Sequence, residues 1–326
     1  MAKKKEIRRI GVLSSGGDTP GMNAAIRAIV MVAEENGIET YGIRGGFRGM
    51  INGDIVHLDP SVVRTIAHKG GTILKTSRCP EFVEKEGQER AVQMAQAYDL
   101  DGVVTIGGDG TMRGAAALCA LNIPTITLPG TIDNDLSYTD YTIGFDTAVS
   151  GVINEIIKIR DTMVSHDRIG VVEVMGNRCG DIALHAGLAG SMDYIILPEM
   201  EYDIDVMCAE LKKKALKGHP TSMIVVAEGA AHGNEMAKYI NSRTGLDTKS
   251  VVLGYTQRGG SPTARDRILA ARLGQHAVRL LTSGVSNRAV GVRGDVVVDM
   301  DIMEALEKPK VFNRELYDLA CTLVRQ

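Results

Sequence analysis

The sequence predicts an α/β protein made of two α/β/α lobes with mainly parallel sheets. Short apolar runs rich in β-branched residues alternate with longer stretches of helical period. Three of the early runs end in loops that contain Gly or Asp, as the strand ends of ligand-binding α/β sheets do. The length of 326 residues suits about two domains.

The first part of the chain repeats strand, loop and helix. Strands are expected at Ile7–Ser14, Ile38–Ile43, Gly102–Ile106 and Ile123–Leu128. Helices are expected at Met22–Asn36 and Gln88–Tyr98, with another that ends at Leu121. Because the carboxyl ends of parallel strands lie at one edge of a sheet, the loops after these strands should line one crevice.

A second α/β series follows a long amphipathic helix expected at Asp146–Ser165, whose apolar residues recur at i, i+3 and i+4 spacing. Its strands are expected at Arg168–Met175, Tyr194–Leu197 and Ser222–Ala227, and its helices at Asp181–Ala189, Asp203–Lys217 and Asn234–Arg243. A strand at Ser250–Tyr255 and a helix at Thr263–Thr282 are expected to return to the first domain. The ending, with Val296–Met300 and Asn313–Val324, is ambiguous. We therefore predict one domain at residues 1–138 plus about 251–300, and a second at 139–250 plus about 301–326.

Composition argues against several classes of protein. The net charge is −3, no basic stripe appears beyond the short start at residues 2–5, and Trp is absent, so a nucleic-acid partner is not expected. The five Cys include no C-x-x-C pair and are expected to be reduced thiols. Neither a signal peptide nor an apolar run of membrane-spanning length is visible, so we expect a cytoplasmic protein with no membrane partner.

The turn containing Gly16, Gly17 and Asp18 follows a strand and opens a helix. Glycines there let backbone N–H groups approach a phosphate, and a helix N-terminus favours negative charge. A tight turn with no ligand is an equally good interpretation of this motif alone. Neither the G-x-G-x-x-G fingerprint nor a G-x-x-x-x-G-K-[ST] loop occurs.

The run Gly107–Thr111 also lies between a strand and a helix. Asp109 can hold Mg²⁺, and Thr111 lies where a helix N-terminus can face phosphate oxygens. The alternative is that Asp109 caps the helix, which contributes about 1 kcal/mol and needs no metal.

The run Thr131–Asp135 places two carboxylates two residues apart beside a hydroxyl. A carboxylate at a strand end can accept the proton of an attacking alcohol in phosphoryl transfer. Asp-Asn-Asp is also a common turn composition, so its position after a strand is what favours the catalytic interpretation.

Together these motifs resemble those of the bacterial-type ATP-dependent 6-phosphofructokinases. The matching segments, in family order, are Ser15–Asp18, Pro20–Asn23, Gly107–Gly110, Pro129–Asp135, Val172–Gly176, and Gly254 with Gln257–Pro262. The likeness runs from about residue 7 to residue 320. It implies two Rossmann-like lobes with an active-site cleft between them, the first lobe binding ATP and the second fructose 6-phosphate.

The resemblance implies transfer of the ATP γ-phosphoryl group to the 1-hydroxyl of fructose 6-phosphate, with Mg²⁺ as cofactor. It makes Asp133 the base, Thr131 a neighbour of the transferred group, Asp135 a supporting carboxylate and Arg78 a stabiliser of developing charge. Asp109 matches the metal residue. The matching nucleotide positions are Gly17, Arg78, Cys79, Gly108, Asp109, Gly110, Thr111 and Gly114.

Gly110 and Gly130 bear on the phosphoryl donor. Pyrophosphate-dependent relatives carry Asp and Lys at these positions, where two glycines leave room for the α-phosphate of ATP. Besides a pyrophosphate-dependent enzyme, the alternatives are a kinase that shares only the Gly107–Thr111 loop and a non-catalytic regulatory paralogue. Asn177 and Tyr255 are the only support for the paralogue.

The sugar-phosphate side is expected to combine residues of the second domain with Arg258 and the Thr131–Asp133 loop. The resemblance assigns to it Thr131, Ile132, Asp133, Arg168, Met175, Gly176, Asn177, Glu228, Lys249, Tyr255 and Arg258. Arg168 matches an Arg that reaches the 6-phosphate across a subunit boundary, and the usual assembly is a homotetramer. Asn177, Lys249 and Tyr255 stand where the family commonly has Arg, Arg and His.

The effector site of allosteric relatives is altered here. Its matching positions include Arg27, Arg160, Asp193, Lys217 and His219. Met31, Asp54 and His219 replace two Arg and one Lys, while Arg44 and Arg48 lie nearby in sequence. Loss of positive charge should weaken an anionic effector, so we expect weak or absent control by ADP and phosphoenolpyruvate.

Overall fold

The computed structural model describes residues 7–324, so the charged stretch at 2–5 lies outside the described residues. The chain divides into two compact units. Unit 1 contains the described residues up to Thr131, with Leu136–Thr147 and Arg258–Lys310. Unit 2 contains Ile132–Asp135, Ala148–Gln257 and the described residues from Val311 on.

Unit 1 is built on a seven-stranded sheet with the order β11-β10-β5-β4-β1-β2-β3. Five of its strands run parallel, and β3 and β11 pair antiparallel at the two edges. The strands are β1 (Arg9–Ser14), β2 (Glu39–Ile43), β3 (Ile55–His57), β4 (Gly102–Gly107), β5 (Thr125–Pro129), β10 (Arg288–Arg293) and β11 (Val296–Asp301).

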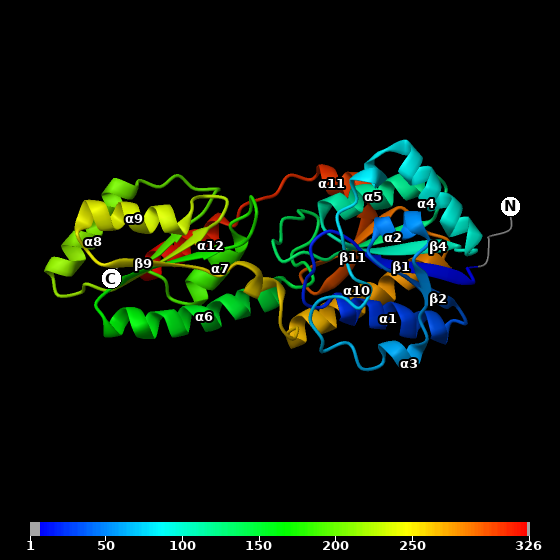
Figure 1. The fold of residues 1–326 in the computed structure, drawn as a ribbon, viewed down its shortest axis with the longest axis horizontal. Coiled ribbons are helices and arrows are strands. Elements are labelled where there is room, and N and C mark those ends of the chain that lie inside the picture. The colour runs from blue at the N-terminus through cyan, green and yellow to red at the C-terminus, as the bar shows by residue number, and fades with distance from the viewer. Residues whose placement is uncertain (1–6, 325–326) are drawn as a thin grey trace. The chain divides into compact units, whose positions relative to one another are not determined.

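Helices cover both faces of this sheet because side chains alternate along each strand (Figure 1). Ile10 and Val12 pack with α1 and α10, whereas Leu13 packs on the other face with α2, α4 and α5. The helical elements of unit 1 are α1 (Met22–Glu35), α2 (Phe47–Asn52), α3 (Pro60–Val63), η1 (Pro80–Val83), α4 (Lys85–Ala97), α5 (Asp109–Ala120), α10 (Ala264–Thr282) and α11 (Ile302–Glu307).

The strand order reverses between β1 and β4. From β1 the chain continues through α1 to β2 on one side, while β4 and β5 extend the sheet on the other side. In doubly wound sheets, ligands bind outside the carboxyl ends of the strands at such a reversal. The loops that follow β1 and β4 are the two glycine motifs of the sequence.

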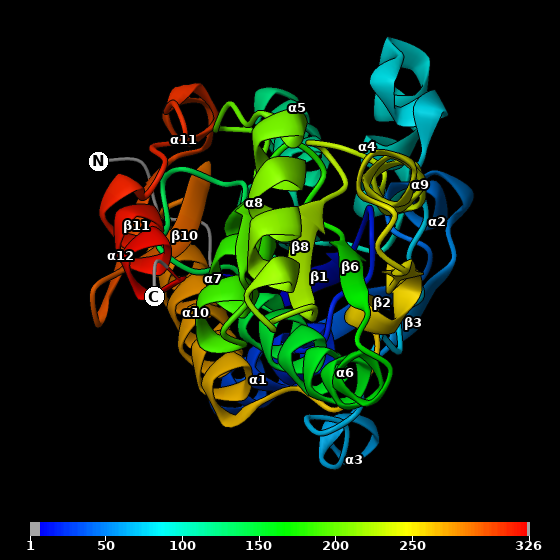
Figure 2. The same cartoon turned by 90° about the vertical axis from the view of Figure 1, so that its left-hand side faces the viewer.

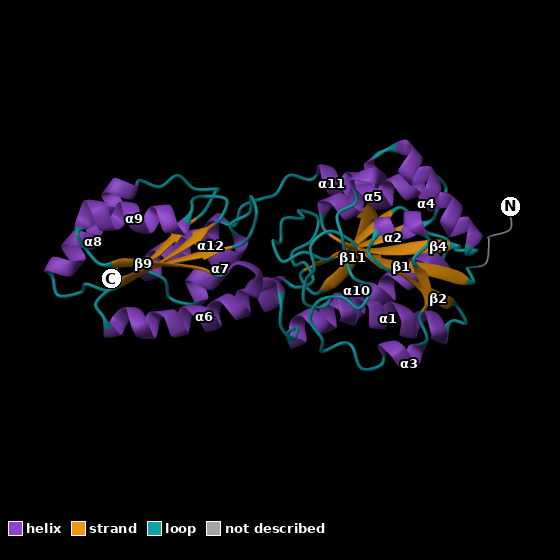
Figure 3. Cartoon of the chain, viewed as in Figure 1, coloured by secondary structure: helices purple, strands orange, loops and turns teal. Residues whose placement is uncertain are grey.

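Unit 2 has a four-stranded parallel sheet with the order β7-β8-β6-β9. Helices α8 and α9 pack on one face through Met207, Leu211 and Ile240 against β6 and β8 (Figure 2). Figure 3 shows the strands of unit 2 in orange and its helices in purple. The elements are α6 (Phe145–Ser165), which starts in unit 1, β6 (Ile169–Val174), α7 (Asp181–Ala189), β7 (Tyr194–Ile196), α8 (Ile204–Leu216), β8 (Ser222–Ala227), α9 (Gly233–Thr244), β9 (Thr248–Val252), η2 (Gly254–Arg258) and α12 (Arg314–Val324).

The α/β class with mainly parallel sheets is confirmed, but one strand assignment is wrong. The strand expected at Ser250–Tyr255 is β9, which begins at Thr248 and pairs with β6 in unit 2 rather than returning to unit 1. Tyr255 lies beyond it in the 3₁₀ helix η2. The pairing of Ile169 with Thr248 places β9 in the sheet of unit 2. An apolar run in the sequence does not show which strand it will pair with.

The domain boundaries also differ from the expected ones, since residues 132–135 and 251–257 cluster with unit 2. Residues 139–147 cluster with unit 1, because Ile143 pairs with Gly130 and its N–H bonds the carbonyl of Pro129. Residues 301–310 belong to unit 1 as well, since Ile302 and Ala305 of α11 pack against α5.

None of the helices in residues 7–324 combines the length and the apolar character that a membrane span requires.

Candidate functional site

The loop after β1 is held in a tight turn. Gly16 has φ 85°, and the hydroxyl of Thr76 donates to its carbonyl over 2.9 Å. Nη1 of Arg258 donates to the carbonyl of Asp18 over 3.1 Å. A Cβ on Gly17 would lie 2.5 Å from this Nη1, so the guanidinium occupies the space that a side chain at Gly17 would need.

The start of α5 is bonded to the same loop. The hydroxyl of Thr111 donates to the carbonyl of Ser15 over 3.0 Å. A Cβ on Gly107 would approach Oγ1 of Thr111 to 2.3 Å and the carbonyl of Ser15 to 2.5 Å, so this junction closes only around a glycine. Asp109 is the first residue of α5 and Gly108 holds the N-cap position, so Asp109 does not cap the helix. Its carboxylate is half-exposed and lies 3.3 Å from Arg113.

Thr131 completes this group of residues in unit 1. The N–H of Gly130 donates to the carbonyl of Gly107 over 2.9 Å, which continues the pairing of β4 with β5. A Cβ on Gly108 would lie 3.8 Å from that of Thr131. The loops after β1, β4 and β5 therefore meet at one edge of the sheet, as the sequence predicts.

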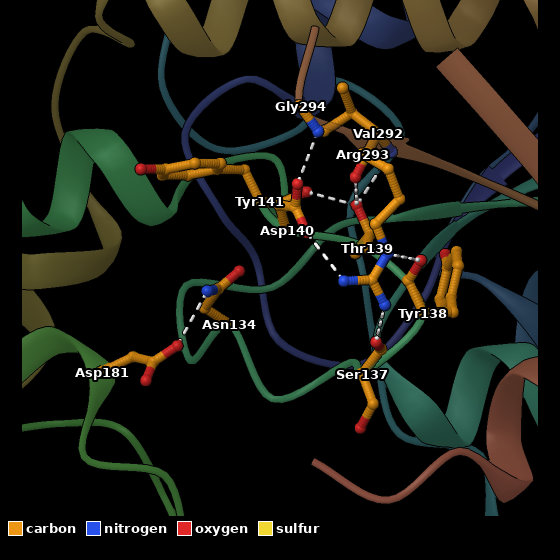
Figure 4. Close-up of polar contacts among 10 residues, drawn as sticks. All are labelled: Asn134, Ser137, Tyr138, Thr139, Asp140, Tyr141, Asp181, Val292, Arg293 and Gly294. Atoms are coloured by element: carbon orange, nitrogen blue, oxygen red, sulfur yellow. Dashed lines mark hydrogen bonds and ion pairs between the residues drawn. The ribbon is translucent and has the colours of Figure 1, made fainter. Parts of the chain in front are cut away.

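The carboxylates of Asp133 and Asp135 follow directly along the chain. The α-carbon of Asp133 lies within about 7 Å of that of Thr131, because two residues span no more than that. Oδ1 of each carboxylate is buried. Between them Asn134, with φ 51°, donates through Nδ2 to Oδ2 of Asp181 over 2.9 Å (Figure 4). Ile132 is fully buried.

The remaining nucleotide candidates are Arg78, Cys79 and Gly114, which contact α2 or the core beside it. Arg78 is exposed, and its carbonyl accepts a bond from Nη2 of Arg48 over 3.0 Å. Cys79 packs against the core beneath α2 and α4. Gly114 is buried under the ring of Phe47, which a Cβ there would meet at 2.4 Å, so packing alone requires this glycine.

In unit 2, the loops after β6 and β8 lie side by side because these strands pair as far as Val174 and Ala227. The N–H of Asn177 donates to Oε1 of Glu228 over 2.9 Å. The N–H of Met175 donates to Oε1 of Gln257 over 3.1 Å. Gly176, with φ 143°, makes the turn between them.

Arg168 and Lys249 meet at Asp247. Nε of Arg168 lies 2.6 Å from Oδ2 and Nζ of Lys249 lies 2.7 Å from Oδ1. Hydrogen bonds from Lys249 and then Arg168 hold the pKa of Asp247 below its usual range. Tyr255, in contrast, is 84% exposed.

Three of the five candidate effector residues bind other parts of their own unit. Arg160 donates to the carbonyls of Gly190 and Ser191 at the end of α7. Asp193 pairs with Lys214 over 3.0 Å. Nε of Arg27 donates to the carbonyl of Arg64. Lys217 and His219 directly follow α8. In unit 1, Arg44 forms an ion pair with Asp54 over 2.5 Å, so Asp54 neutralises a nearby cation.

A magnesium ion fits this site only together with phosphates. Residues 7–324 contain no group of three His, Cys, Asp or Glu that could hold a metal. Asp109 offers one half-exposed carboxylate at a helix N-terminus. Mg²⁺ is usually bound through one or two carboxylates plus substrate phosphates and waters, and this donor set meets that pattern.

Several neighbours of the site were not singled out from the sequence. They are Thr76, Asp181, Asp247 and Gln257, each bonded to a candidate residue or its neighbour. Gln257 lies within the motif Gln257–Pro262, but nothing in the local pattern marks the other three.

Comparison with known proteins agrees with this arrangement. The family model described as phosphofructokinase matches residues 9–281. Curated ATP-dependent 6-phosphofructokinases of Clostridium botulinum and Clostridium tetani are 52% and 51% identical over 97% of this chain and 99% of their own length.

Solved structures extend the likeness to the fold. The phosphofructokinase of Saccharomyces cerevisiae superposes with a TM-score of 0.85 at 34% identity, covering 92% of this chain and 45% of the yeast chain. A pyrophosphate-dependent phosphofructokinase of Marinobacter aquaeolei shares the fold, with a TM-score of 0.86 at 20% identity over 98% of this chain and 92% of its own. Matches of this extent in sequence and fold show that the chain belongs to the phosphofructokinase family.

Proposed function

We propose that this chain is an ATP-dependent 6-phosphofructokinase, which transfers the γ-phosphoryl group of ATP to the 1-hydroxyl of fructose 6-phosphate. The products are fructose 1,6-bisphosphate and ADP. The observation that carries the proposal is the meeting, in unit 1, of the Gly16–Gly17 turn, the start of α5 and Thr131. The near-complete match to the clostridial enzymes supports the same activity.

Unit 1 binds the nucleotide in this proposal. Backbone N–H groups of the turn after β1 and of the first turn of α5 face the phosphates, where the helix dipole favours negative charge. Arg78 adds a permanent positive charge for the transferred group. Asp109 would hold Mg²⁺ together with phosphate oxygens, and the ion would supply positive charge beside the triphosphate.

Asp133 acts as the general base. Its carboxylate accepts the proton of the sugar 1-hydroxyl while the oxygen attacks the γ-phosphorus and the bond to the β-phosphate oxygen breaks. Thr131 donates a hydrogen bond to the group in transfer, and Asp135 supports Asp133. The burial of Oδ1 in both carboxylates suits proton transfer away from bulk water.

ATP is the proposed donor, and Gly110 is the more informative of the two donor positions. A Cβ on Gly110 meets nothing within 4 Å, so this glycine leaves space that packing does not demand. A Cβ on Gly130 would meet Ile106 at 2.9 Å, so packing requires that glycine whatever the donor.

Unit 2 binds the sugar phosphate. Glu228, Met175, Gly176, Asn177 and Tyr255 face the sugar, with Arg258 of unit 1 among its contacts. Arg168 and Lys249 carry the charge for the 6-phosphate, with Arg168 acting across a subunit boundary of a homotetramer. All five cysteines are free, which suits a cytoplasmic enzyme.

A coupled assay tests the proposal. Product formed from fructose 6-phosphate is followed through aldolase, with ATP or pyrophosphate as donor and with or without Mg²⁺. We expect turnover with ATP and Mg²⁺ and less than about one hundredth of it with pyrophosphate. Turnover with pyrophosphate alone identifies the other donor class, and binding without turnover identifies a regulatory paralogue.

A further inference from the structure

A polar clamp holds the segment that follows the Thr131–Asp135 loop. The guanidinium of Arg293, at the end of β10, donates to three groups of residues 137–140 (Figure 4). Nη1 bonds Oδ1 of Asp140 over 2.8 Å, Nε bonds the carbonyl of Tyr138 over 3.2 Å, and Nη2 bonds the carbonyl of Ser137.

The backbone reinforces this contact in both directions. The N–H of Gly294 donates to Oδ2 of Asp140 over 2.7 Å, so both carboxylate oxygens are used. The N–H of Asp140 donates to the carbonyl of Val292 over 2.9 Å, and the N–H of Val292 donates to Oγ1 of Thr139 over 3.0 Å. Hydrogen bonds given and accepted by the segment thus bind it to the end of β10.

Apolar packing against α5 also holds this segment. Leu136 and Tyr138 are buried in a cluster with Met112 and Ala115 of α5. Tyr138 is 1% exposed and bonds the carbonyl of Val290, and burial raises the pKa of its phenol, which stays neutral. Leu136, which directly follows Asp135, is therefore packed against α5, the helix that starts with Asp109.

The loop is also closed at its beginning. The hydroxyl of Thr142 donates to the carbonyl of Thr131 over 2.6 Å, and the N–H of Ile143 donates to the carbonyl of Pro129 over 2.8 Å. Residues 132–135 are consequently a short excursion whose two ends belong to unit 1.

We propose that Arg293, paired with Asp140, is a positioning residue that sets the backbone of the loop carrying Asp133. The inference rests on the proposed function, in which Asp133 is the base. An excursion of four residues has little freedom once both ends are fixed, because the chain spans at most about 3.5 Å per residue. If residues 137–140 are released from Arg293, the carboxylate of Asp133 can move. A misplacement of about 1 Å can lower turnover about 100-fold.

The test compares Arg293→Met with Arg288→Met. Arg288 lies on the same strand and also binds a carboxylate, with its Nε 2.6 Å from Asp299, but that pair stays within the β10–β11 hairpin. Both substitutions remove one guanidinium–carboxylate pair from β10, and only the first acts on residues 137–140. Arg293→Lys is the conservative variant, since Lys keeps the charge for Asp140 but cannot supply three donors in a fork.

We expect Arg293→Met to lower kcat about 10- to 100-fold per folded protein, with the KM values for ATP and fructose 6-phosphate within about threefold of wild type. Arg293→Lys recovers part of the loss, and Arg288→Met stays within about twofold of wild-type kcat. Equal kcat in the two Met variants, or a loss in Arg293→Met that appears only in the melting temperature, overturns the proposal.

Amide hydrogen exchange provides an arm that needs no activity. Residues 132–136 should exchange at least about fivefold faster in Arg293→Met than in Arg288→Met, and equal exchange overturns the clamp. If the wild type shows no phosphofructokinase turnover, the proposed function fails. Faster exchange in Arg293→Met then still supports the clamp, although the role for Asp133 is lost.

Discussion

The hydroxyl of Thr111 donates a hydrogen bond to the carbonyl oxygen of Ser15 over 3.0 Å. This bond joins the first turn of α5 to the loop after β1, and Thr111 is buried. The two glycine motifs, more than ninety positions apart in the chain, are thereby joined directly to each other.

Thr111→Val should weaken nucleotide binding about tenfold, because it leaves the Ser15 carbonyl without this donor at a cost of about 1–3 kcal/mol. Thr111→Ser keeps the hydroxyl and serves as the control. Calorimetric titration with a non-hydrolysable ATP analogue measures the difference. Equal affinities for the Val and Ser variants would contradict the role of this bond.

Asp133→Asn should lower kcat about 10²- to 10⁴-fold, since the amide cannot accept the sugar proton. Nucleotide affinity should stay within about twofold of wild type because Asp109 and Thr111 are untouched. Steady-state kinetics together with the same titration separate the two effects. A variant that keeps more than about a tenth of kcat would rule out Asp133 as the base.

Gly110→Asp should reduce turnover with ATP, because it fills open space beside the nucleotide and adds a negative charge. Gly110→Ala is the matched control, since its Cβ meets nothing within 4 Å and alanine is favoured in a helix. The ratio of kcat/KM for ATP in the two variants is the measurement. We expect at least a tenfold difference, and none if the α-phosphate lies elsewhere.

Asp247→Asn should lower the KM for fructose 6-phosphate about two- to fivefold, because Arg168 and Lys249 no longer share their charge with a carboxylate. The pKa of Asp247 is lowered, so its charge would be lost only at a pH below the ordinary range for Asp. The effect should therefore be constant from about pH 7 to 9. An unchanged or higher KM would mean that these cations do not meet the phosphate.

Control by effectors should be weak. Arg44 forms an ion pair with Asp54, and Arg160 donates hydrogen bonds to carbonyls at the end of α7. Saturation curves for fructose 6-phosphate, recorded with and without ADP or phosphoenolpyruvate, should shift less than about twofold. A large shift with either ligand would show that the remaining basic residues suffice.

Local sequence pattern predicts most of the helices and strands, but it does not predict which strands pair with each other. The helices α1, α7 and α10 begin and end within one residue of the positions expected, because their apolar faces repeat over several turns. Local pattern does not mark β3, which has only three residues, or β10, whose central residues are buried without a polar–apolar alternation. β9 was assigned to the wrong sheet, because edge pairing depends on residues eighty positions away.

The amino-acid sequence alone determined the chemistry of this protein. The glycines, carboxylates and hydroxyls at its strand ends identified the phosphofructokinase family and predicted which loops meet. Only the tertiary structure decided how those groups are held: that Arg258 lies over Gly17, that Asp247 pairs with both Arg168 and Lys249, and that Arg293 binds residues 137–140 behind the Asp133 loop. Apart from the Asp247–Lys249 pair, these contacts join residues that are distant in sequence, and no local period or motif records a contact made by folding at long range.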